Sequence, residues 1–164
     1  MAVFLNNQFL ENEHASLNIM DLSIQRGYAA FDYLRTVNGK PLFLENHLDR
    51  FYTSAEAMRL PLSKTKKELT GIINELIKKS GLSQAGIRLI LTGGYSPDAY
   101  SLAEPNLLIT CNPQTLPSVA DFEKGISIIT YEYQRDLPQV KNTNYMMAVW
   151  LQSKIKKKRA DDVL

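Results

Sequence analysis

The segment 135–145 carries the residues of this sequence with the clearest chemical potential. Lys141 follows Pro138, which should end a strand, and precedes a predicted helix that Asn142 or Thr143 could cap. The positive end of a helix dipole disfavours an ammonium group, so this lysine is expected to release its proton more readily than a surface lysine. A neutral amine can condense with a carbonyl compound, which indicates Schiff-base chemistry. Most lysines near a helix start are simply exposed, however, and this argument alone does not choose among the chain's lysines.

Metal and thiol chemistry find little support in the sequence. His14 and His47 have no other histidine or cysteine at ligand spacing, so no metal site is expected. The single cysteine, Cys111, excludes an intramolecular disulfide. It lies in an apolar run and is predicted to be a buried, inert thiol.

Composition narrows the class of protein. The chain has 164 residues, of which 45% are hydrophobic, enough for a packed core. Its 19 basic and 17 acidic residues give a net charge of +2, so no broad basic field predicts nucleic-acid binding. No apolar run approaches the roughly 20 residues of a membrane span, and no N-terminal targeting pattern is present. We therefore expect a soluble cytoplasmic protein with no membrane partner.

The elements that must position Lys141 follow from hydrophobic periodicity and turn signals. Asn38-Gly39 between two β-rich runs is the strongest hairpin signal in the chain. The segments predicted as strands or hairpins are 2–10, 29–44, 86–92 and 106–112, and those predicted as helices are 45–60 and 64–80. Together they predict an α+β domain over 1–112, in which an antiparallel sheet and two helices form two layers.

A second domain is predicted to begin after a linker. The stretch 112–119 is rich in Pro, Asn and Ser, and we place the linker at 113–120. Within 121–164 we expect a strand at 125–134, a helix at 143–158 and an apolar strand that starts at 161–164. We therefore read 121–164 as the first part of a second domain.

Two sequence blocks resemble the class IV (fold-type IV) aminotransferases, which include branched-chain aminotransferases, D-amino-acid aminotransferases and aminodeoxychorismate lyases. The pattern LPxxKxxNY at 137–145 resembles the family's cofactor-lysine segment. Upstream, NGKPLF at 38–43, followed by ExHLDRF at 45–51 and by Ser54-Ala55, is similar to the family's "NG…F…EHLDRL…SA" block, and FDYLR at 31–35 resembles its "FE-x-x-R" strand. The likeness covers nearly the whole chain. It implies the N-terminal domain of that fold followed by part of the cofactor-binding domain.

The resemblance implies three contacts with pyridoxal 5'-phosphate. Lys141 would hold the cofactor as a Schiff base and, once released, would act as general base. Arg50 would contact the phosphate, a task that suits a guanidinium fork. Its alternative role is a surface arginine of the helix, paired with Glu45, Asn46 or Asp49. Tyr145 would hydrogen-bond the phenolic oxygen of the cofactor, or else be a half-buried helix tyrosine.

The resemblance also implies three substrate contacts. Arg88 interrupts the apolar strand GIRLILT and resembles an arginine near the substrate carboxylate in branched-chain members, where a tyrosine stands at the position of Gly86. The alternative is a strand residue that faces solvent. Phe31 would line the substrate pocket or, alternatively, be a core aromatic. Arg35 would be the third residue of the substrate site.

The implied activity moves an amino group between an amino acid and a 2-oxo acid. D-amino-acid aminotransferases carry an Arg and a His in the loop that corresponds to 96–100, where this chain has Asp98 and Tyr100. D-amino-acid specificity is therefore not expected, and Arg35, Arg88 and Tyr145 favour a branched-chain-like L-amino acid. A lyase on the same scaffold is the close alternative, and a non-catalytic dimerisation or binding module is the alternative for the chain alone. The resemblance further implies a homodimer.

Two departures from the family bear on these expectations. The usual Gly-Asp-Gly before the "FE" strand is Gly27-Tyr28-Ala29 here. The carboxylate that faces the pyridine nitrogen and the turns that bind the phosphate lie, in the family, beyond the position of Leu164. Backbone N–H groups at a helix start are a major source of phosphate affinity. We therefore expect part of a longer enzyme, and weak cofactor binding by this chain alone.

Overall fold

The computed structural model describes residues 2–164, which divide into two compact units. The first unit extends to Gln114 and also includes Gln139–Thr143. The second unit contains Thr115–Pro138 and Asn144–Leu164. The segment around Lys141 therefore belongs to the first unit, although the sequence analysis had assigned it to the second domain.

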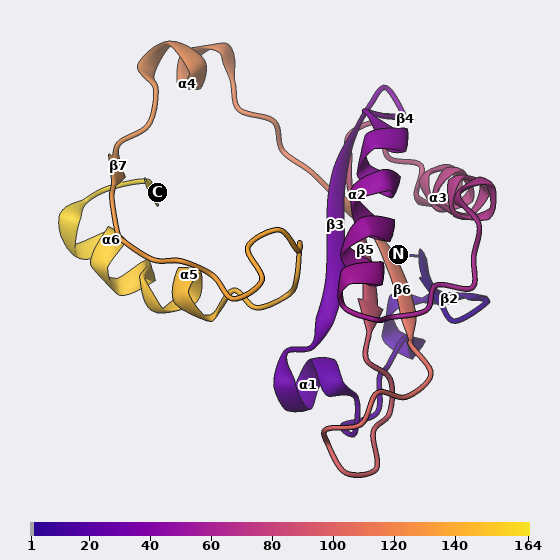
Figure 1. Ribbon diagram of the computed structural model, residues 1–164. Helices are drawn as coiled ribbons and strands as arrows, with labels where there is room; N and C mark the ends of the chain where they lie inside the picture. Colours follow the sequence, from indigo (N-terminus) through magenta and orange to yellow (C-terminus); the bar gives the residue numbers. More distant parts are fainter. Residues whose placement is uncertain (1) are drawn as a thin grey trace. The chain divides into compact units, whose positions relative to one another are not determined.

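The first unit is built on a six-stranded antiparallel sheet with the order β2-β1-β6-β5-β3-β4 (Figure 1). Its strands are β1 (Ala2–Leu5), β2 (Gln8–Glu11), β3 (Ala29–Val37), β4 (Lys40–Pro41), β5 (Ala85–Thr92) and β6 (Leu107–Pro113). Both predicted hairpins are confirmed. Their turns, Asn6-Asn7 and Asn38-Gly39, have positive φ at all four residues, a conformation that Asn and Gly adopt at low cost.

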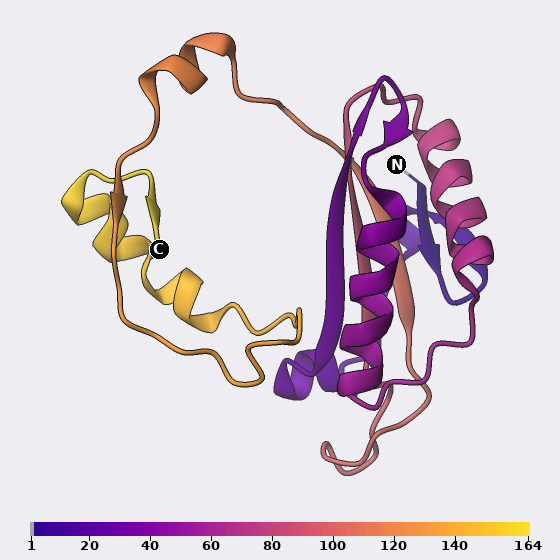
Figure 2. The same ribbon diagram turned by 45° about the horizontal axis from the view of Figure 1, so that its top comes forward.

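Two long helices cover one face of this sheet (Figure 2). Helix α2 (Leu44–Ala57) packs against β3, and α3 (Lys66–Ser80) packs against β1 and β6. A capping box between Thr65 and Glu68 begins α3, and Gly81 ends it in the left-handed conformation at φ 65°. The predicted two-layer α+β fold is confirmed. Two shorter elements, η1 (Asn12–His14) and α1 (Leu22–Arg26), connect β2 to β3.

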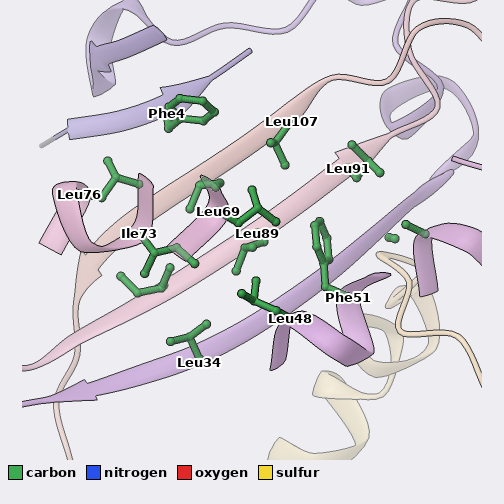
Figure 3. Packing of buried hydrophobic residues seen from close by; sticks show 14 of the residues in the cluster. Phe4, Leu34, Leu48, Phe51, Leu69, Ile73, Leu76, Leu89, Leu91 and Leu107 are labelled. Carbon is green, nitrogen blue, oxygen red and sulfur yellow. The ribbon is translucent and has the colours of Figure 1, made fainter. Parts of the chain in front are cut away.

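The hydrophobic core lies between the helices and the sheet, where side chains from both layers interdigitate (Figure 3). Because side chains alternate along a strand, Ala30, Asp32 and Leu34 of β3 face the helices. Phe31, Tyr33 and Arg35 therefore lie on the opposite side of the sheet, which we call the second face. Cys111 is buried in the core, as predicted, and burial raises the pKa of its thiol.

The second unit contains three short helices and a two-stranded parallel sheet. Its elements are α4 (Val119–Lys124), β7 (Ile128–Ile129), α5 (Met146–Trp150), α6 (Gln152–Lys158) and β8 (Asp162–Val163). The predicted terminal strand is confirmed as β8, which pairs with β7. The prediction of a strand over 125–134 was too long, because only two residues find a partner. The predicted helix at 143–158 starts later and is interrupted at Leu151. None of the helices within residues 2–164 is long and apolar enough to span a membrane.

Candidate functional site

The segment that carries Lys141 forms a short strand-like addition to the edge of β3. The backbone N–H of Phe31 donates to the carbonyl of Lys141 at 2.9 Å, and that of Thr143 donates to Ala29 at 3.0 Å. Val140, just before the lysine, is buried in the core. This edge is available because β4 pairs only with the far end of β3. Unpaired backbone groups at a sheet edge readily accept another strand.

The predicted helix cap next to Lys141 was wrong. The first helix after the lysine, α5, begins at Met146, so four residues separate them. Asn142 forms an antiparallel bridge with Ala30, and the hydroxyl of Thr143 donates to the carbonyl of Gly27 at 3.1 Å. Pairing with β3 therefore replaces the expected capping, and the helix-dipole argument for Lys141 loses its basis. The position of the lysine is set by the sheet edge instead.

Both the backbone and the amine of Lys141 have defined neighbours. Its backbone N–H donates to the hydroxyl of Ser54 on α2 at 3.1 Å, and this serine is buried. Its Nζ lies 4.4 Å from the ring centroid of Phe31, a cation–π contact. Phe31 is half-buried on the second face and lies outside the core cluster. The amine is thus placed beside this ring at the start of β3.

Arg50 is anchored by a buried carboxylate of the neighbouring strand. Its Nε donates to Oδ2 of Asp32 at 2.7 Å and its Nη2 donates to Oδ1 at 2.9 Å. Asp32 is completely buried, whereas half of the Arg50 side chain is exposed. A carboxylate partner therefore comes from β3, and on its own helix the Nη2 of Arg50 lies 3.1 Å from Nδ1 of His47. A bidentate pair of this kind fixes the plane of the guanidinium.

Asp32 is ionised by virtue of its partners. Burial alone raises the pKa of this carboxyl group, but hydrogen bonds from Arg50 and His47, the charge of Arg50 and a backbone N–H hold the pKa of Asp32 below its ordinary value. His47 contributes through Nδ1, 2.8 Å from Oδ1, and it must donate because an ionised carboxylate only accepts. Three groups on two elements thereby lock one another in place.

Helix α2 carries Arg50 and also binds the backbone of Lys141. Ser54, which binds the backbone of Lys141, is four residues after Arg50, and residues at this spacing are neighbours on a helix surface, roughly 5–6 Å apart at Cβ. On β3 the partners of the two cations, Phe31 and Asp32, are consecutive. An amine and a guanidinium whose supports come from the same strand and the same helix suit a molecule with one carbonyl and one anionic group.

The predicted substrate residues share the second face with Phe31. Arg88 of β5 lies opposite Tyr33 in the strand register, and Arg35 lies opposite Gly86. Both arginines are exposed. None of the ion pairs found within residues 2–164 involves either of them. Two guanidinium groups on one sheet face suit the carboxylate of a small substrate.

Tyr145 belongs to the second unit, where it immediately precedes α5 and is half exposed. There it lines a hollow of about 560 Å³ together with Tyr131, Tyr133 and Arg135. The other predicted site residues are all in the first unit. Within residues 2–164 no group of three or more His, Cys, Asp or Glu side chains is placed to hold a metal ion.

Asp32 and Ser54 were not predicted as site residues, and His47 was considered only as a metal ligand, a role that the sequence does not support. A signal for Asp32 existed: it is an acid on the same strand face as Ala30 and Leu34, two apolar positions. A buried charge is costly unless it is paired, so it predicts a cation opposite. Ser54 carried no comparable signal.

Comparison with known proteins places these residues in a family context. Residues 29–164 match the family model described as amino-transferase class IV. A Methanocaldococcus jannaschii protein assigned as a branched-chain-amino-acid aminotransferase is 29% identical over 157 residues, which cover 91% of this chain and 54% of that protein. The D-alanine aminotransferase of Staphylococcus haemolyticus is 28% identical and is matched over 79% of this chain and 47% of its own length. The chain thus spans about half the length of these relatives.

Solved structures show the same fold. A branched-chain amino acid aminotransferase from T.th., solved with pyridoxamine 5'-phosphate, superposes with a TM-score of 0.89 at 20% sequence identity. The match covers 99% of this chain and 58% of that one. The arrangement of β3, α2 and the Lys141 segment is therefore embedded in a known architecture.

Proposed function

This chain belongs to the class IV aminotransferases, and on that premise we propose that the protein transfers an amino group between an amino acid and a 2-oxo acid, with pyridoxal phosphate held by Lys141. Pyridoxal phosphate is the cofactor of this family. The observation that carries the proposal is the shared support of Lys141 and Arg50 by β3 and α2. In this proposal the amine takes the aldehyde of that cofactor and the guanidinium takes its phosphate.

Each residue of the site has a separate task. When bound, the cofactor supplies an electron sink for negative charge at the substrate α-carbon. The amine of Lys141 holds the cofactor covalently and, once released, moves a proton to or from that α-carbon. Arg50 binds the phosphate, and Asp32 keeps its guanidinium in the required plane. Tyr145 contacts the phenolic oxygen, and Phe31 shapes the pocket next to the amine.

The second face supplies the substrate contacts. Arg88 binds the substrate carboxylate, and Arg35 adds positive charge one row along the sheet. We assign a branched-chain-like L-amino acid as the donor. Relatives at 29% and 28% identity carry branched-chain and D-alanine names, respectively, so the donor must be tested directly. The homodimer and the cytoplasmic location remain predictions from the sequence.

The first half-reaction, in which an amino-acid donor gives its amino group to the cofactor, tests this function. The cofactor-loaded protein is mixed with L-leucine or with D-alanine, and the cofactor spectrum and the 2-oxo acid products are followed over time. We expect L-leucine to convert the bound cofactor to its amine form with release of 4-methyl-2-oxopentanoate, faster than D-alanine releases pyruvate. Faster conversion by D-alanine would reverse the assigned stereochemistry. Failure of both donors, combined with turnover of aminodeoxychorismate, would select the lyase.

A further inference from the structure

Tyr33 and Gly86 form a size-matched pair on the second face. The two residues lie on neighbouring strands, with Tyr33 opposite Arg88 and Gly86 opposite Arg35. A Cβ atom added at Gly86 would lie 2.7 Å from Cζ and 2.8 Å from Cε2 of the tyrosine ring, and it would also overlap the hydroxyl group. The ring therefore extends across the glycine and occupies the space of its missing side chain. Any larger residue at position 86 would displace it.

The far end of the tyrosine is also fixed. Its hydroxyl group donates to Oε1 of Gln114, which directly follows β6. The side chain thus starts on β3 and extends to Gly86 of β5, where its hydroxyl group meets the side chain of Gln114. Because its ring and its hydroxyl group are already held, this half-buried tyrosine loses little further conformational freedom when another side chain packs against it.

Arg88 contacts the ring of Tyr33. Its guanidinium carbon lies 5.9 Å from the centroid of the Tyr33 ring, within the range of a cation–π contact. Cross-strand neighbours on one face of a sheet are close enough for such a contact. Since Arg88 takes part in none of the ion pairs of residues 2–164, the tyrosine ring is the contact that orients it.

We propose that Tyr33, seated on Gly86 and anchored by Gln114, is a positioning residue that orients Arg88 for the substrate carboxylate. The proposal rests on the proposed function, in which Arg88 makes that contact. A guanidinium held in one plane loses less conformational freedom when a carboxylate binds both of its N–H groups. The pair also affects which substrates fit: the Tyr33 ring occupies part of the space beside Arg88, and Gly86 adds no side chain to it.

Carboxylate binding is measured without the amino-transfer reaction, so failure of the proposed function and failure of this inference are distinguishable. The probe is 4-methylpentanoate, which has neither an amino nor an oxo group and does not depend on Lys141. It is titrated into the protein while the Nε–Hε resonance of Arg88 is followed by NMR, with Arg88→Leu to assign that resonance. We expect a saturable shift. The dissociation constant should rise about two- to fivefold in Tyr33→Ala, the range of an exposed cation–π contact.

Two further variants separate positioning from stability. Tyr33→Phe keeps the ring and removes only the Gln114 anchor, so its dissociation constant should lie between those of the wild type and Tyr33→Ala. Gly86→Ala should lower the midpoint of thermal unfolding by roughly 3–10 °C through overpacking, and by less than half as much in the Tyr33→Ala background. A wild-type Arg88 resonance that does not respond to the probe overturns the inference. So does an unchanged dissociation constant in both tyrosine variants, even if their unfolding midpoints fall.

Discussion

Replacing Lys141 with alanine is expected to lower kcat for amino transfer by roughly 10²–10⁴-fold through loss of proton transfer alone, with a further loss because the cofactor is no longer held covalently. The physical reason is the position of the amine next to the Phe31 ring. The backbone of Lys141 is held by β3 and α2, the same two elements that hold Arg50. The measurement is steady-state kinetics with saturating pyridoxal phosphate, L-leucine and a 2-oxo acid as the amino acceptor. Unfolding of the variant is followed in parallel.

Lys154→Ala is the matched control for this prediction. Its Nζ also lies over an aromatic ring, 4.7 Å from the centroid of Tyr131, but it belongs to the second unit and to none of the proposed roles. We expect its kcat to stay within about twofold of the wild type, as for a surface residue that does not touch the reacting atoms. If Lys141→Ala kept more than a tenth of the wild-type kcat, the lysine assignment would be wrong.

Replacing Asp32 with alanine is expected to weaken cofactor binding and to destabilise the first unit. The variant removes the buried acceptor of two Arg50 hydrogen bonds and one from His47, so the guanidinium is no longer held in one plane. Hydrogen bonds to a charged group contribute about 1.5–3 kcal/mol. If Arg50 loses one such bond to the phosphate, the dissociation constant of pyridoxal phosphate should rise about tenfold or more. Absorbance titration measures this constant.

Asp21→Ala separates the two effects. Asp21 is likewise fully buried, and it accepts hydrogen bonds at 2.8 Å from the Ser23 backbone and from the side chains of Thr92 and Asn106. None of these hydrogen bonds comes from an arginine. We expect the free energy of unfolding to fall in this variant while the cofactor dissociation constant remains unchanged. Equal losses of affinity in both aspartate variants would show that Asp32 acts only through stability.

The stabilising role of Asp32 has a pH signature. Its pKa is lowered in the folded protein relative to its ordinary value of 3.8. A carboxyl group of this kind contributes stability that is fully present above 3.8 and is lost as the pH falls toward its folded pKa. In Asp32→Asn the corresponding part of the acid unfolding curve should be missing, whereas above that range the variant should show a constant deficit. Chemical denaturation at a series of pH values measures both.

The local part of the fold was predictable from the sequence because its signals are local. Asn38-Gly39 specifies a tight hairpin through positive φ, and the three- and four-residue apolar period specifies the two long helices. The second unit was harder. Its strands are two residues long, and pairing between residues more than 30 positions apart decides where they form.

The site depended on contacts that no local pattern encodes. Residues 141–143 pair with β3 across more than 100 positions of sequence, and this pairing overrode the helix cap expected at Asn142 or Thr143. Lys141 and Arg50 were identified by resemblance rather than by local physics. Their common support became visible only when Ser54 and Asp32 were placed. Tyr33 on Gly86 is a similar case, since the glycine alone would have suggested a weakened strand.

The most direct test of the central claim is to map the amine that holds the cofactor. The protein is incubated with pyridoxal phosphate and reduced with borohydride, and the modified peptide is identified by mass spectrometry after proteolysis. We expect a single phosphopyridoxyl modification at Lys141 and its loss when phosphate is supplied in competing excess. Modification spread over several lysines, or confined to one other than Lys141, would contradict it.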